Sequence, residues 1–112
     1  MKPETCFLIA TRLEAKPILS SKLWQKYDEV NGIKRYRAEK ADLVIIGVGP
    51  TRSAISTGWL LSQNYKNWVN LGVVGALSDE FSFCDAITIK TCLSRDDYHP
   101  FDRKIDLKVG YF

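Results

Sequence analysis

The chain has 112 residues, of which 46% are hydrophobic and 26% are charged, and its 16 basic and 13 acidic side chains give a formal net charge of +3. These values exclude disordered and collagen-like proteins and predict a single globular domain over residues 1–112. The small basic excess is scattered along the sequence, so neither a nucleic acid nor an anionic membrane is expected as a partner.

The longest apolar runs fall well short of the roughly 20 residues that a membrane helix needs. The first residues show no secretory signal pattern, so we expect a cytoplasmic protein. Cys6, Cys84 and Cys92 form no C-x-x-C pair, which makes a disulfide framework or a thiolate metal site unexpected. We predict reduced thiols in the core.

The first strand is predicted at the apolar run from Cys6 to Ala10. The next four residues, Thr11 to Glu14, have capping-box spacing, but a helix that began there would contain Pro17, which lacks an amide donor. We therefore predict that the helix begins near Ala15 or Lys16. Glu14 is then expected on the loop between strand and helix.

A hairpin is predicted between residues 28 and 37. Asn31-Gly32 favours a type I′ turn, because both residues tolerate positive φ. Polar and apolar side chains alternate on either side of the turn, which is typical of a strand pair with one solvent-exposed face. We expect this pair to extend or flank the main sheet.

Residues 42–77 have the order of a βαβ unit. Leu43 to Ile46 is a β-branched apolar run, Thr51 to Gln63 is helix-like, and Trp68 to Val74 is apolar again. Continuous apolar runs are typical of parallel strands that are buried on both faces. We expect the two strands to be parallel and adjacent, with a right-handed crossover.

Glycines follow both strands of this unit. Ligands of open α/β sheets bind at the carboxyl edge, and glycine lets the backbone approach a sugar or an anion closely. The same glycines are equally expected in plain turns, and the two interpretations are compatible. Arg52 lies near the start of the following helix, where an anion could meet it, although a solvated side chain is expected. The glycines are Gly47, Gly49, Gly72 and Gly75.

A further strand is predicted from Asp85 to Leu93, followed by a polar segment and a closing run, Ile105 to Phe112. His99 is the single histidine, so no histidine cluster or triad can form. The acidic residues around it are too few for a hard-cation loop. We expect no metal and no cofactor.

Four ordered segments resemble the nucleoside phosphorylase and nucleosidase superfamily, in particular methylthioadenosine/S-adenosylhomocysteine nucleosidase and futalosine hydrolase. In that family a strand ends in G-x-G before an alanine-rich helix, and a second strand ends in an N-x-G-x-A-G-G-L type turn. The resemblance implies a partial phosphorylase/hydrolase-like α/β fold, with a mostly parallel mixed sheet and flanking helices. The matching segments are residues 47–54, 70–77, 84–88 and 98–99.

The resemblance implies hydrolysis of the N-glycosidic bond of a purine nucleoside, of the methylthioadenosine, S-adenosylhomocysteine or futalosine type. It assigns Glu14 the catalytic role of positioning water, because the family places a functional glutamate just after its first strand. Without the resemblance, Glu14 would be a solvated acid at a helix N-terminus. The implied substrate-binding residues are Gly47, Gly49, Asn70, Gly72, Val73 and Gly75.

The family's later residues, a Met-Glu pair for the ribose and an Asp that protonates the purine, have no counterpart in this sequence. We therefore expect an N-terminal half that is inactive or weak by itself and that forms a homo-oligomer or binds a complementary C-terminal chain. One alternative is a non-catalytic domain that binds a nucleoside or a partner. A purine nucleoside phosphorylase is a further alternative, disfavoured because Asn70 stands where phosphorylases have a phosphate-binding arginine.

Overall fold

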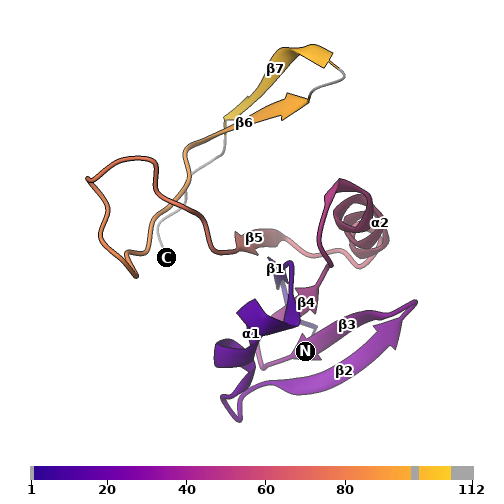
Figure 1. Ribbon diagram of the computed structural model, residues 1–112. Coiled ribbons are helices and arrows are strands. Elements are labelled where there is room, and N and C mark those ends of the chain that lie inside the picture. The colour runs from indigo at the N-terminus through magenta and orange to yellow at the C-terminus, as the bar shows by residue number, and fades with distance from the viewer. Residues whose placement is uncertain (1, 97–98, 107–112) are drawn as a thin grey trace. The chain divides into compact units, whose positions relative to one another are not determined.

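The computed structural model describes residues 2–96 and 99–106, and it forms two compact units, Met1–Gly75 and Ala76–Phe112. Figure 1 labels the elements of each unit. The first unit contains β1 (Thr5–Ile9), α1 (Arg12–Leu19), β2 (Gln25–Val30), β3 (Ile33–Arg37), β4 (Ala41–Ile45), α2 (Pro50–Leu61) and β5 (Asn67–Leu71). The second unit contains β6 (Thr91–Asp96) and β7 (His99–Asp106).

The first unit is built on a five-stranded sheet with the order β2-β3-β4-β1-β5. β1 pairs in parallel with both β4 and β5, whereas β3 is antiparallel to β2 and β4. The predicted α/β class, with a mixed sheet and flanking helices, is confirmed. No helix in the part of the chain that the structure describes is long and apolar enough to cross a membrane.

The prediction that the two strands of the βαβ unit are adjacent is wrong, because β1 lies between β4 and β5. Ile9 at the end of β1 is opposite Ile45 on one side and Leu71 on the other. The crossover through α2 therefore passes one intervening strand. Apolar runs identify buried strands but carry no information on their order. Since all three strands are parallel, their carboxyl ends still meet at one edge.

The core has two clusters, one on each face of the sheet, because successive side chains of a strand point to opposite faces. The cluster next to α2 contains the buried residues Cys6, Val44, Ile46, Leu60 and Tyr65. The cluster next to α1 contains Ile9, Ala15 and Leu43. The alternation of these residues along β1 and β4 places α1 and α2 on opposite faces.

Helix α1 begins at Arg12, earlier than predicted, and contains Pro17. The Thr11 hydroxyl accepts a hydrogen bond from the amide of Glu14 at 3.1 Å, so Thr11 is the N-cap. Such a cap contributes about 1 kcal/mol, and it fixes the start of the helix although Pro17 removes one interior amide donor. Glu14 therefore lies in the first turn of α1 and not on the preceding loop.

The predicted hairpin is confirmed. Asn31 and Gly32 have φ values of 51° and 80°, as a two-residue type I′ turn requires. They connect β2 to β3, and β3 pairs with β4. The hairpin thus extends the central sheet.

The second unit contains one strand pair, in which Thr91 is opposite Asp106. The strand predicted from Asp85 is wrong over residues 85–90, which form no strand. Ile87 and Ile89 are exposed there, and a strand is stable only where a neighbour satisfies its backbone groups. In the closing run, residues 107–112 lie outside the described part of the chain, as does residue 98 of the Tyr-His segment.

All three cysteines are free, but only Cys6 is buried. The prediction of core thiols is therefore wrong for Cys84 and Cys92, which are exposed. Cys84 lies in the segment without regular structure before β6 and has a positive φ of 69°. A thiol is small and weakly polar, so its residue type alone does not decide between core and surface.

Candidate functional site

The Glu14 side chain connects the first helical turn to the end of β5. Its Oε1 accepts a hydrogen bond from the Thr11 hydroxyl at 2.7 Å, and its Oε2 accepts one from the amide of Val73 at 3.2 Å. Glu14 Oε2 also lies close to Gly72, where an added Cβ would be 3.6 Å away. The carboxylate is thus held between two segments that are 59 positions apart in the sequence.

The sheet produces this contact. β1 and β5 are neighbours and end at the same edge, with Ile9 opposite Leu71. α1 starts directly after β1, and the chain leaves β5 through Gly72, so both segments emerge side by side. Sequence analysis placed Glu14, Gly72 and Val73 at a common edge, and the structure brings these three residues into contact.

Gly47 and Gly49 follow β4 at the same edge, with φ values of 88° and 93°. Gly49 is the N-cap of α2. An added Cβ at Gly47 would lie 2.8 Å from Cδ of Arg52, whose side chain packs over this glycine. Both glycines are therefore required by the turn itself, as the plain-turn interpretation predicts, and they leave backbone exposed to a ligand.

The remaining predicted binding residues lie around the end of β5. Asn70 is in β5 opposite Leu8, and its side chain is exposed. Val73 is also exposed, and nothing lies within 4 Å of the position that a Cβ would take at Gly75. Within the described residues, neither Asn70 nor Gly75 contacts Glu14.

Glu14 is a half-buried carboxylate whose two oxygens each accept one hydrogen bond. Such a group is suited to the positioning of a water molecule. Glu14 receives hydrogen bonds from Thr11 and Val73, which fix its orientation, and a carboxylate oxygen has a further lone pair for water. A general base must lie within about 2.6–3.2 Å of the proton that it removes. The edge thus combines an oriented acceptor with flexible glycine backbone.

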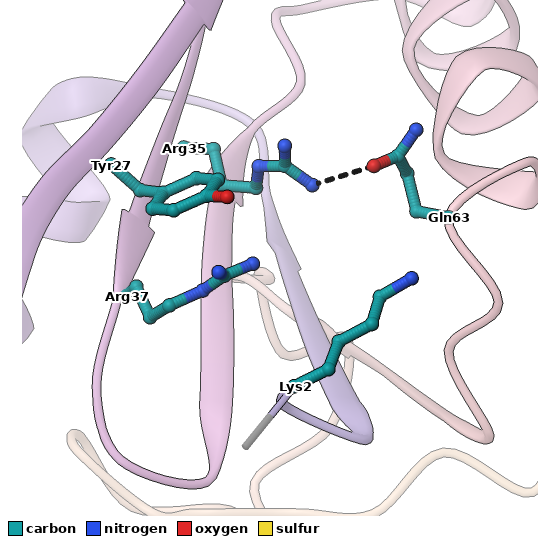
Figure 2. A pocket seen from close by; sticks show the side chains of 5 residues that line it. All are labelled: Lys2, Tyr27, Arg35, Arg37 and Gln63. Atoms are coloured by element: carbon teal, nitrogen blue, oxygen red, sulfur yellow. Dashed lines mark hydrogen bonds between the residues drawn. The ribbon is translucent and has the colours of Figure 1, made fainter.

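A second polar cluster, which sequence analysis missed, lies at the opposite edge of the sheet. Lys2 precedes β1, Arg37 ends β3 opposite the start of β4, and Gln63 lies between α2 and β5. All three therefore lie near the amino ends of the parallel strands. They line an open pocket of about 470 Å³, which Figure 2 shows from close by; it is called the basic cavity below. Its lining residues are Lys2, Tyr27, Arg35, Arg37 and Gln63.

Two partly buried ion pairs lie next to this cavity. Arg37 donates from Nε and Nη2 to the two oxygens of Asp42 at 2.8 and 2.9 Å, and Asp42 is completely buried. Arg35 donates from Nε to Asp28 at 2.8 Å and from Nη1 to Gln63 at 3.2 Å. The hydrogen bond that Arg35 donates to Asp28 is the main cause that raises the pKa of Arg35, and the one that Arg37 donates to Asp42 is the main cause for Arg37.

Tyr65 joins the two ion pairs. Its hydroxyl donates to Asp42 and accepts from Nη1 of Arg35. Burial, followed by the bond to Asp42, raises the pKa of Tyr65 to about 12. The only sequence signal for the cluster was the spacing of Arg35 and Arg37, which puts both on one face of β3; their partners come from distant segments.

No group of three potential metal ligands occurs among the residues described by the structure. His99 lies in β7 of the second unit.

The fold defines a class of α/β protein in which three parallel strands end at one edge of a mixed sheet. No protein-family model matches the sequence, and no curated protein matches it. Solved structures do: an MTAN mutant of Helicobacter pylori with 5′-methylthioadenosine in its active site is 19% identical, with a TM-score of 0.57. The S-adenosylhomocysteine nucleosidase of Streptococcus pyogenes, in complex with 5-methylthiotubericidin, is 24% identical, with a TM-score of 0.57.

A futalosine hydrolase mutant of Helicobacter pylori is 17% identical, with a TM-score of 0.51. The matches cover 73%, 73% and 70% of this chain, but only 38%, 37% and 38% of those proteins. The predicted resemblance to the nucleosidase superfamily is thus confirmed for the fold. The chain spans less than half the length of the proteins that it resembles.

Proposed function

We propose that this chain is the water-positioning part of a nucleosidase that hydrolyses the N-glycosidic bond of a purine nucleoside. The observation that carries the proposal is the placement of the Glu14 carboxylate at the carboxyl edge, where it accepts the amide hydrogen of Val73. A carboxylate fixed between the loop after β1 and the turn after β5 faces the edge where α/β sheets bind ligands.

The reaction needs two proton transfers. The oxygen of water forms a bond to C1′ of the sugar while the bond from C1′ to the purine nitrogen breaks. Glu14 takes the proton that water releases, and the departing purine takes up a proton from a general acid. We assign the first step to Glu14 and propose that the acid lies outside the residues that resemble the family.

The proposed substrate class is supported by the molecules bound to proteins of similar fold. An MTAN holds 5′-methylthioadenosine and an S-adenosylhomocysteine nucleosidase holds a related compound. We propose methylthioadenosine, S-adenosylhomocysteine or futalosine as the type of substrate. The residues proposed to face it, besides Glu14, are Gly47, Gly49, Asn70, Gly72, Val73 and Gly75.

A second polypeptide is part of the proposal, because the chain spans only 37–38% of the proteins in which the fold recurs. β5 is an outer strand of the described sheet, and an outer strand can pair with another chain. We propose a homo-oligomer or a complementary C-terminal chain, in the cytoplasm. The partial coverage also favours a second candidate, a domain that binds a nucleoside without cleaving it.

Calorimetric titration with methylthioadenosine, combined with a sensitive assay for released adenine, tests the proposal. We expect binding to the 112-residue chain and weak hydrolysis that Glu14→Gln abolishes. Glu39→Gln is the matched control, because Glu39 is an exposed loop residue away from this edge. Turnover that survives Glu14→Gln would reject the assigned role, and binding without turnover would favour the second candidate.

A further inference from the structure

We propose that the basic cavity at the amino edge of the sheet binds a small multivalent oxyanion, with phosphate or carboxylate groups. The cavity is open to solvent and is lined by Lys2, Tyr27, Arg35, Arg37 and Gln63. It lies at the end of β1 and β4 opposite to Glu14. It is therefore a separate site from the proposed nucleoside edge.

The lining of the cavity is positive. Three of its five residues are basic, and no acidic residue lines it in the described part of the chain. Asp42, which pairs with Arg37, is completely buried, whereas Asp28, which pairs with Arg35, keeps 30% of its side chain exposed. Three basic groups face two carboxylates, so one positive charge is in excess. Lys2 is exposed and Arg37 is partly exposed, whereas Arg35 is buried.

Two of the basic groups retain donors for a ligand. Arg37 uses Nε and Nη2 for Asp42 and has Tyr27 as a further hydrogen-bonding neighbour, which leaves part of the five N–H donors of its guanidinium group for a ligand. Lys2 is exposed, and its ammonium group has no hydrogen bond or ion pair within the described residues. Figure 2 shows the Lys2 and Arg37 side chains extending into the same space.

The arginine side chains are ordered before any ligand binds. Cζ of Arg37 lies 3.6 Å from the centroid of the Tyr27 ring, and Cζ of Arg35 lies 4.9 Å from it. The Trp59 ring lies 5.0 Å from Cζ of Arg35. A guanidinium group held by stacking and by a carboxylate loses little freedom on binding, so a charged hydrogen bond to it is gained at low entropic cost.

The size of the cavity selects a small ligand. About 470 Å³ is within the range of small-molecule sites, and the scattered charges of the chain provide no extended basic surface for a polyanion. Guanidinium and ammonium groups form strong hydrogen bonds with phosphate and carboxylate oxygens. A compact ion with two or more negative charges fits both the donors and the volume.

Calorimetric titration of the full chain at low ionic strength, with inorganic pyrophosphate and with citrate, tests this proposal. We expect heat with at least one probe, and Lys2→Gln should weaken its binding about tenfold, because one charged hydrogen bond is lost. Lys16→Gln, which removes an exposed lysine of α1 outside the cavity, should leave the affinity unchanged. Tighter binding of pyrophosphate identifies phosphate chemistry, and tighter binding of citrate identifies carboxylate chemistry.

A second variant and a spectroscopic measurement locate the site. Arg37→Lys keeps a cation next to Asp42 but removes the remaining guanidinium donors, so it should also weaken binding while circular dichroism confirms the fold. Amide NMR shifts should be largest at Tyr27 and Gln63 and small at Gly72. No heat with either probe, or equal losses in Lys2→Gln and Lys16→Gln, would overturn the proposal, as would shifts centred on Gly72.

Discussion

Arg37 holds the completely buried carboxylate of Asp42 in a two-pronged ion pair, with N to O distances of 2.8 and 2.9 Å. Burying a carboxylate in the apolar interior is costly unless it is paired. Here Arg37 comes from the end of β3 and Asp42 from the start of β4, in register as neighbours. The pair therefore fastens the hairpin to the parallel part of the sheet.

Replacing Arg37 by Met should destabilise the protein by about 3–5 kcal/mol, because Asp42 would remain buried without its counter-ion. Urea denaturation followed by circular dichroism measures this loss. The pair of Lys66 and Glu4 is a suitable control, since both side chains are mostly exposed, and Glu4→Gln should leave the denaturation midpoint unchanged. Equal effects of the two substitutions would contradict the structural role of the buried pair.

Two glycines of the same region should respond to alanine in opposite directions. Gly47 has a φ of +88°, and a Cβ there would lie 2.8 Å from Cδ of Arg52. Gly58 lies inside α2 with open space around it. Gly47→Ala should lower the melting temperature, whereas Gly58→Ala should stabilise the protein by about 0.4–1 kcal/mol through lower entropy of the unfolded chain. Stabilisation by both substitutions would show that Gly47 is not constrained as described.

The N-cap of α1 should affect both stability and the candidate site. Thr11→Val removes the hydroxyl that caps the amide of Glu14 and donates to its carboxylate. We expect a loss of about 1 kcal/mol in the free energy of unfolding, together with weaker nucleoside binding. Thr11→Ser keeps the hydroxyl and should restore both properties. A stability loss without any change in nucleoside binding would separate the cap from the proposed function of Glu14.

Stability should fall at alkaline pH because of two buried groups. Burial is the main cause that raises the pKa of Cys6 from 9.0 to about 12 and that of Tyr65 from 10.0 to about 12. Above pH 9 the unfolded chain loses these protons before the folded chain does, so the unfolded state is favoured. The stabilisation is complete below pH 9 and is lost as the pH rises towards 12.

Urea denaturation at several pH values between 8 and 11 measures this dependence. The ordinary pKa values of the two groups, 9.0 and 10.0, lie within this interval. Cys6→Ala should reduce the loss of stability above pH 9, even if it lowers the free energy of unfolding at every pH. Cys84→Ala is the matched control, because that thiol is exposed. An unchanged slope in Cys6→Ala would show that the buried thiol does not cause the effect.

Local sequence patterns determined much of the fold. The apolar runs identified β1, β4 and β5, and Asn31-Gly32 identified the hairpin. The glycines after β4 and β5 identified where the chain turns at the carboxyl edge, and ligand binding there stays a prediction. Each of these features depends on a few neighbouring residues, through burial on both faces or through positive φ. The position of Glu14 after the first strand also followed from local order along the chain.

Only the tertiary structure decided which of these elements touch. The insertion of β1 between β4 and β5, the bond from Val73 to Glu14 and the cavity formed by Lys2, Arg37 and Gln63 all join distant segments. Helix α1 begins at Arg12 although Pro17 lies inside it, so the Thr11 cap outweighs the local signal of the proline. Strand order and side-chain pairing depend on the relative energies of whole arrangements, whereas a short stretch of sequence specifies only its own backbone and its exposed or buried faces.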